Sequence, residues 1–147
     1  MKLQRKFMLK RVPEYLTDIV PETIKYFFTN QDNNLIMFVE NESLNVFGKT
    51  KANGKLKIIS KEEFEKNKSV KIGRIVNFVR FNVPIDDNIA KVDIYTGEHS
   101  GLKTVSVKIE EQDYDKFIIP KWFGEEITFN AEYKKFNLSH ANLKEII

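Results

Sequence analysis

Apolar and polar residues alternate along several short stretches of this chain. A β-strand produces this pattern because its successive side chains point to opposite faces. In the opening stretch, KLQRKFMLK, Phe7 and Leu9 fall on one face. Lys2, Gln4 and Lys6 fall on the other. The polar face of such a strand is turned either to solvent or to a wet, charged interior, and alternation alone does not separate the two.

Eight strand-like runs of this kind are separated by turn signals, which favours a mostly antiparallel sheet or barrel. They span residues 2–10, 23–28, 35–39, 44–49, 55–59, 74–83, 91–95 and 102–109. Asn53-Gly54, between the fourth and fifth runs, is typical of a hairpin turn.

Helical patterns are fewer. Residues 61–67 follow Ser60, and a glutamate at the third position after this serine completes a capping box. Residues 111–118 predict a short helix that ends before Pro120, and residues 131–147 predict an interrupted C-terminal helix. The expected fold class is therefore α+β, dominated by antiparallel strands.

Composition limits the class of protein. A chain of 147 residues, 41% hydrophobic and 12% aromatic, predicts one folded domain over residues 1–147. Without cysteine it has no disulfide and no thiolate metal site. It contains no apolar run long enough to cross a membrane and no signal-peptide pattern, so we expect a cytoplasmic protein with no membrane partner. The net charge of +3 weakly favours a polyanionic partner.

The back half of the chain carries three motifs in a fixed order: DIYTGEHSGLKTVSVKI, FIIPKWFGEEIT and AEYKKFNLSHANL. In order and spacing they resemble the CYTH family, the triphosphate tunnel metalloenzymes, over residues 91–143. The most specific segment is PKWFGEEIT, which resembles the family's P-x-W-F-G-x-E-V-T. The opening KLQRKFML stands where the family has E-I-E-R-K-F-L-V, and the middle of the chain, residues 30–80, fits loosely.

This resemblance implies a closed, eight-stranded antiparallel β-barrel, or tunnel, flanked by helices. In the family, lysines and arginines inside the tunnel hold a triphosphate, and glutamates hold Mg²⁺ or Mn²⁺. The activities that the resemblance implies are hydrolysis of inorganic or organic triphosphates and, in some members, adenylate cyclisation.

The chain departs from the family at the metal-binding acids. Lys2 stands where the family's E-x-E-x-K motif has its first glutamate. The lysine at the end of the motif is kept as Lys6. Lys108 stands at one acid of the family's E-V-E-F strand, and Lys91 replaces the acid two places before Asp93. A hard divalent cation needs several oxygen ligands, so Asp93 by itself is a weak metal candidate.

We therefore expect a degenerate tunnel, a pseudoenzyme without catalytic residues, that binds a polyphosphate or nucleotide-like anion without a catalytic metal or other cofactor. Lysine ammonium groups can pair with phosphate oxygens but cannot generate hydroxide from water. The expected phosphate-binding residues are three of the family type and three that this chain adds: Lys6, Lys49 and Arg80, with Lys2, Lys91 and Lys108.

Two other functions remain open at this point. The first is an interaction or adaptor protein that binds a protein partner through the outer surface of a barrel plugged by apolar residues such as Met37, Val39 and Phe78. The second is a triphosphatase that depends on Mg²⁺ or Mn²⁺ held at an atypical site.

Nucleic acid is a further possible partner. The basic residues that suggest it are Lys66, Lys68, Lys71 and Arg74, next in sequence to Phe64 and Phe78.

The histidine of the TGEHSG turn, His99, is expected to be an exposed loop residue.

Overall fold

The computed structural model describes residues 1–41, 46–50 and 56–140, with residues 46–50 and 56 described in their backbone only. Nine strands make up most of it: β1 (Lys2–Leu9), β2 (Glu22–Gln31), β3 (Asn34–Asn41), β4 (Val46–Thr50), β5 (Leu56–Ile59), β6 (Ile72–Ile85), β7 (Asn88–Thr96), β8 (Lys103–Glu110) and β9 (Phe123–Glu126). The helices are α1 (Lys61–Lys68), α2 (Lys135–His140) and four short 3₁₀ turns: η1 (Glu14–Asp18), η2 (Gly97–His99), η3 (Glu111–Lys116) and η4 (Ala131–Tyr133).

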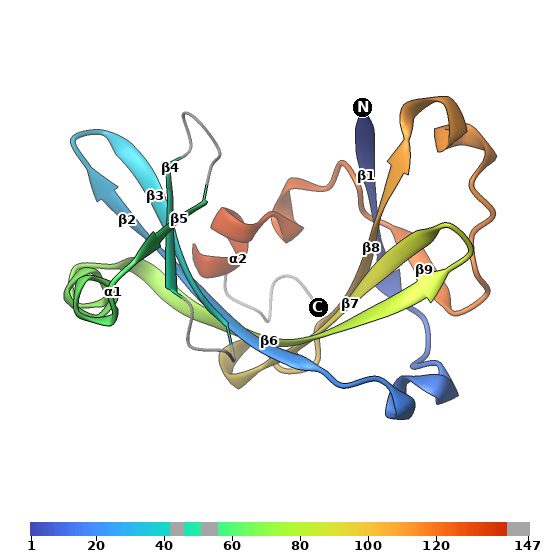
Figure 1. Ribbon diagram of the computed structural model, residues 1–147, viewed down its shortest axis with the longest axis horizontal. Helices are drawn as coiled ribbons and strands as arrows, with labels where there is room; N and C mark the ends of the chain where they lie inside the picture. The colour runs from blue at the N-terminus through green and yellow to red at the C-terminus, as the bar shows by residue number, and fades with distance from the viewer. Residues whose placement is uncertain (42–45, 51–55, 141–147) are drawn as a thin grey trace.

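All nine strands form one antiparallel sheet in the order β5-β4-β3-β2-β6-β7-β8-β1-β9. The sheet is strongly curved, with β2–β5 forming one wall, β7, β8, β1 and β9 the other, and β6 joining them (Figure 1). In the part of the chain that the structure describes, the two edge strands β5 and β9 do not pair with each other. The expectation of a closed, eight-stranded barrel is therefore wrong in both strand number and closure.

The C-terminal segment covers part of the concave side of the open sheet. In Figure 1, α2 lies inside the concave side, between the two walls. Its Phe136 and Leu138, with Tyr133 of η4, pack against apolar side chains of the inner face, among them Tyr26 and Phe78. The apolar inner surface of β2 and β3 is thus buried by a helix, and strand-to-strand closure is not needed to remove it from water.

The opposite, convex face carries a separate core. Phe7, Val92 and Val105 project from β1, β7 and β8 on this side, and Trp122 and Phe123 cover them. At the other end of the sheet, Phe64 of α1 packs on the convex face of β2 and β3 against Phe27 and Phe38. The alternation in the sequence therefore separates one apolar face from one mixed face, as expected for strands.

Several predicted elements are confirmed with adjusted ends. The Ser60 hydroxyl accepts a hydrogen bond from the backbone N–H of Glu63 at 3.1 Å, which confirms the N-cap of α1. The predicted helix over 111–118 is the 3₁₀ turn η3, and the interrupted C-terminal helix is present as η4 and α2 up to residue 140. The predicted Asn53-Gly54 turn lies outside the described residues.

The ninth strand, β9, was not predicted from the sequence. It pairs with β1 through Phe7 and Glu126 and places the PKWFGEEIT motif at the edge of the sheet. Among the described residues, no helix has the length and apolar character that crossing a bilayer requires.

Candidate anion-binding site

A cavity of about 450 Å³ opens on the concave face of the sheet. Most of its lining comes from the polar faces of β1, β6, β7 and β8, and one residue comes from α2. The lining residues are Lys2, Gln4, Arg80, Asp87, Asn88, Ile89, Lys91, Ser106, Lys108 and Lys135.

Strand register brings the basic residues together. Ser106 of β8 lies between Lys6 of β1 and Lys91 of β7, because it pairs with both. Lys108, two residues further along β8, faces the same side and pairs with Gln4 of β1. Residues that are about a hundred positions apart in the sequence therefore share one small area of the sheet.

The cavity is strongly positive. Its lining contains five cationic side chains and one carboxylate, that of Asp87. Burial, followed by the neighbouring charges of Arg80 and Lys108, lowers the pKa of Lys91, although Asp93 and Glu22 act in the opposite direction. An anion that enters among these cations would stabilise the charged form of Lys91, so the electrostatics of this cavity favour a polyanion.

Arg80 is also held by an acid. Its Nε donates to Oδ1 of Asp93 at 2.8 Å and its Nη2 donates to Oδ2 at 3.0 Å, a bidentate pair across β6 and β7. Burial works to lower the pKa of Arg80, but the hydrogen bond and charge of Asp93 outweigh it and leave this pKa raised. Both carboxylate oxygens of Asp93 therefore already accept hydrogen bonds.

This arrangement does not fit a resident divalent metal. Mg²⁺ and Mn²⁺ take oxygen ligands, usually several carboxylates, and the described residues contain no group of three or more acids and histidines placed to hold one. Asp93, the weak metal candidate of the sequence, would have to give up Arg80 to become a ligand.

Lys6 faces the same side as Lys91 but lies in an adjoining cavity of about 260 Å³ that shares Gln4 and Lys135 with the larger one. Its Nζ donates a hydrogen bond to the backbone carbonyl of Tyr133 at 3.1 Å. Burial, together with the charge of Arg80, lowers the pKa of Lys6, while Asp93 opposes the shift. Lys6 therefore anchors the segment before α2 as well as bordering the site.

Of the six predicted phosphate-binding residues, Lys2, Arg80, Lys91 and Lys108 line the main cavity, and Lys6 lines its neighbour. Lys49 lies in β4, and β3 and β2 separate this strand from β6. Lys135 lines the cavity from α2 and was not among the residues predicted from the sequence. A predicted C-terminal helix carrying two adjacent lysines was visible, but nothing in the sequence placed it inside the sheet.

Two other expectations are changed by the structure. Phe64 and Phe78 are buried, so the basic stretch beside them has no exposed ring from these residues for a base to stack on. Lys68 and Arg74 of that stretch form salt bridges with Glu65 and Glu98. His99 is buried, at 1% exposure, with Nε2 2.6 Å from the carbonyl oxygen of Leu138, so the prediction of an exposed loop residue is wrong.

Comparisons with known proteins agree with the fold. No protein-family profile matches the chain. The chain is 28% identical over 144 residues to an inorganic triphosphatase of Nitrosomonas europaea, a match that covers 90% of this chain and 93% of that protein.

Solved structures give the same result for the fold. The crystal structure of the inorganic triphosphatase NE1496 superposes with a TM-score of 0.79 at 24% identity and covers 96% of this chain and 95% of the other. A second crystal structure, of the hypothetical protein NE1496, also superposes with a TM-score of 0.79 and covers 99% of that chain. Together these likenesses support the resemblance to the tunnel family. They also show that this chain has a mostly antiparallel fold.

Proposed function

We propose that this protein binds a polyphosphate chain, such as tripolyphosphate or the triphosphate of a nucleotide, in the basic cavity and does so without a divalent metal. The observation that carries the proposal is the convergence of Lys2, Arg80, Lys91 and Lys108 on one cavity. In the described part of the chain, the three lysines of this set form no salt bridge that would occupy their charges. The similarity to an inorganic triphosphatase supports a ligand of the same chemical class.

Charge placement explains why a metal is not needed for binding. A divalent ion between carboxylates and phosphates neutralises phosphate charge, and ammonium and guanidinium groups can do the same directly. Here lysines stand at three positions where the resembling family has acids, so the cavity is already positive. Hydrolysis needs an activated water as well, and the described residues offer no metal cluster that would supply one.

The direct test is thermal unfolding with tripolyphosphate or ATP in buffer that contains EDTA. A ligand that binds only the native state raises the midpoint of unfolding as its concentration rises. We expect both ligands to raise it at millimolar concentration or below, and we expect Mg²⁺ to leave the effect unchanged or to weaken it by shielding the phosphates. If neither ligand shifts the midpoint at millimolar concentration, the proposed function is wrong.

A matched pair of variants ties the effect to the cavity. Lys108→Gln removes one charge from the concave face of β8, and Lys103→Gln removes one from the same strand, where residue 103 alternates onto the opposite face. We expect Lys108→Gln to weaken tripolyphosphate binding about five- to tenfold. This corresponds to a free energy of about 1 kcal/mol, which is what one partly exposed charge pair contributes. Lys103→Gln should change it less than twofold. Equal effects would indicate nonspecific attraction by net charge.

Metal-dependent triphosphate hydrolysis is a second candidate function, favoured by the activity in the name of the Nitrosomonas europaea relative. It would require Asp93 to leave Arg80 and join other acids, such as Asp87. Phosphate release from tripolyphosphate should then depend on Mn²⁺ or Mg²⁺ and disappear in Asp93→Ala. Release that is absent with either metal, from protein that binds tripolyphosphate in EDTA, would favour binding alone.

A further inference from the structure

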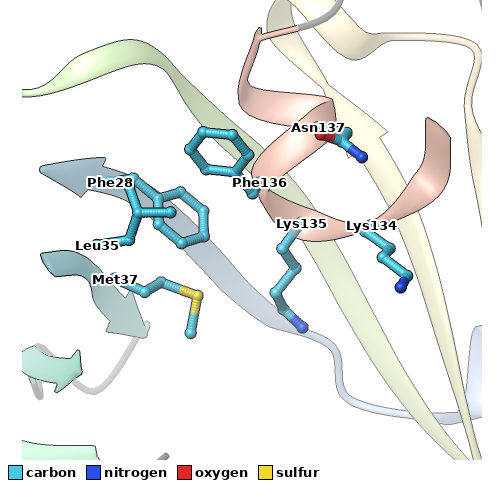
Figure 2. Close-up of a pocket in the computed structure, with 7 residues that line it drawn as sticks. All are labelled: Phe28, Leu35, Met37, Lys134, Lys135, Phe136 and Asn137. Carbon is cyan, nitrogen blue, oxygen red and sulfur yellow. The ribbon is translucent and has the colours of Figure 1, made fainter. Parts of the chain in front are cut away.

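A second cavity, of about 440 Å³, adjoins the basic one and is different in character. Its lining comes from β2, β3, α2 and the residue before α2, and consists of Phe28, Leu35, Met37, Lys134, Lys135, Phe136 and Asn137. Figure 2 shows Phe28, Leu35 and Met37 on one side and the α2 residues on the other, with Phe136 turned toward Phe28. The two rings meet edge to face, with their centroids 5.3 Å apart.

Lys135 connects this apolar cavity to the basic cavity, because it lines both. Lys134 and Lys135 also line the smaller cavity beside Lys6, so the three cavities border this segment of the chain. The position of the helix is fixed, since the hydroxyl of Tyr26 donates to the backbone carbonyl of Lys135 at 2.9 Å. In Figure 2 the side chain of Lys135 runs downward from the start of α2, and that of Lys134 lies on the side away from Phe136.

We propose that the apolar cavity binds the aromatic group of an organic phosphate whose phosphate chain lies in the basic cavity. This inference rests on the proposed function and adds a subsite to it: β2, β3 and α2 would select the organic part of the ligand. Lys135 would lie at the junction, where a phosphate nearest to the organic group passes from one cavity to the other.

The chemistry of the wall selects an aromatic group. Two phenyl rings and a thioether offer edge-to-face and sulfur–ring contacts, which a flat ring uses better than an aliphatic chain does. The volume lies within the range of ordinary small-ligand pockets and exceeds what a single benzene-sized ring fills. The side-chain amide of Asn137 borders the cavity and can serve the polar edge of a heterocycle.

The experiment compares ATP with tripolyphosphate, two ligands with three phosphates that differ in the organic group. Isothermal titration calorimetry in EDTA would measure both affinities for the native protein and for Leu35→Trp, which fills the cavity from a half-buried position. We expect ATP to bind about tenfold more weakly to Leu35→Trp than to the native protein, and tripolyphosphate to bind equally to both. Val20→Trp, at a residue that is 90% exposed, is the matched control and should change neither affinity.

Met37→Ala provides an independent variant if Leu35→Trp does not fold, and it should also weaken ATP selectively. A nuclear Overhauser effect between the adenine protons and the Met37 methyl group would locate the ring directly. If both ligands bind the native protein and both variants leave ATP affinity unchanged, the subsite is wrong and the proposed function stands. If neither ligand binds the native protein, the proposed function fails and the subsite fails with it.

Discussion

Arg80 and Asp93 form the most completely paired charges on the concave face, with two hydrogen bonds of 2.8 and 3.0 Å between one guanidinium and one carboxylate. Their side chains are 17% and 7% exposed, so little water reaches them. The pair lies beside a cavity whose other cations are lysines. Asp93 thus offsets part of the positive charge that would attract an anion, and it keeps Arg80 in place while the cavity is empty.

Replacing Asp93 with asparagine should separate these two effects. Arg80 would lose its counter-charge in a mostly buried position, and we expect the free energy of unfolding to fall by about 2–4 kcal/mol. The cavity would gain one net positive charge, so tripolyphosphate should bind about tenfold more tightly at low ionic strength. Denaturant unfolding and calorimetry would measure the two changes.

The control for this prediction is Asp87→Asn, since Asp87 is the exposed carboxylate among the residues that line the basic cavity. It should tighten tripolyphosphate binding with little change in stability, because an exposed carboxylate contributes little to folding. If Asp93→Asn instead weakens binding, Asp93 acts by positioning Arg80 or a metal, and its role as a counter-charge is wrong.

The pH dependence of binding should report on Lys91. Burial and the charges of Arg80 and Lys108 lower the pKa of this residue below the ordinary lysine value. A bound anion favours the charged form, so affinity is complete below the pKa of Lys91 in the free protein and decreases as the pH rises through it. We therefore expect affinity for tripolyphosphate to begin falling at a lower pH than ordinary lysines would produce.

Lys91→Arg tests this assignment, because a guanidinium stays charged over the whole range. At pH values below the ordinary lysine pKa the variant should keep its affinity while the native protein begins to lose it. The titration of the ligand itself is common to both proteins and cancels in the comparison. Parallel curves for the two proteins would mean that another group controls the pH dependence.

Strand alternation predicted which residues of each strand share its polar face, and the family resemblance predicted that these faces meet. Lys91, Ser106 and Lys108 lie on the polar side of their strands in the sequence, and the structure places all three at one cavity. The predicted strands correspond to eight of the nine in the structure. Period-2 patterns carry this information because each side chain has only two possible faces.

Closure of the sheet could not be predicted in this way. It depends on what covers the inner face of β2 and β3, and this is decided by the contacts of Phe136 and Leu138, about a hundred residues further along the chain. A short helix whose apolar residues are at mixed spacings gives no indication of its partner. For the same reason Lys135 could not be assigned to the site, and the apolar cavity that Phe136 helps to form was not foreseen.

Docking of α2 should depend on Gly73. This residue has φ of +69°, and a Cβ added to it would lie 2.7 Å from the backbone oxygen of Ser139 in α2. Gly97 has a similar φ of +67°, but the nearest atom to a Cβ added there would be the side-chain amide nitrogen of Asn77, at 3.9 Å. Gly97→Ala should therefore cost about 1 kcal/mol of backbone strain.

Gly73→Ala should cost about 3 kcal/mol or more, since the clash with α2 adds to the same strain. Denaturant unfolding of both variants would measure the difference. Equal losses would show that α2 moves aside freely, and the apolar cavity would then lack one fixed wall.

Lys6 should contribute less to anion binding than its position in the resembling family implies. Its Nζ already donates a hydrogen bond to the carbonyl of Tyr133, and burial lowers its pKa, so moving its ammonium group to a phosphate costs the contact with Tyr133. We expect Lys6→Met to weaken tripolyphosphate binding at most about threefold, compared with about tenfold for Lys108→Met.

Calorimetry on the two methionine variants decides the point, because each keeps an apolar stem of similar length. A loss in Lys6→Met as large as in Lys108→Met would mean that Lys6 leaves Tyr133 when the anion enters. The segment before α2 would then be released on binding, and amide exchange at Leu138, whose N–H donates to the carbonyl of Lys134, should become faster with ligand present. With Lys6 held in place, that exchange should stay the same or slow down, since Lys135 at the start of the helix would itself contact the ligand.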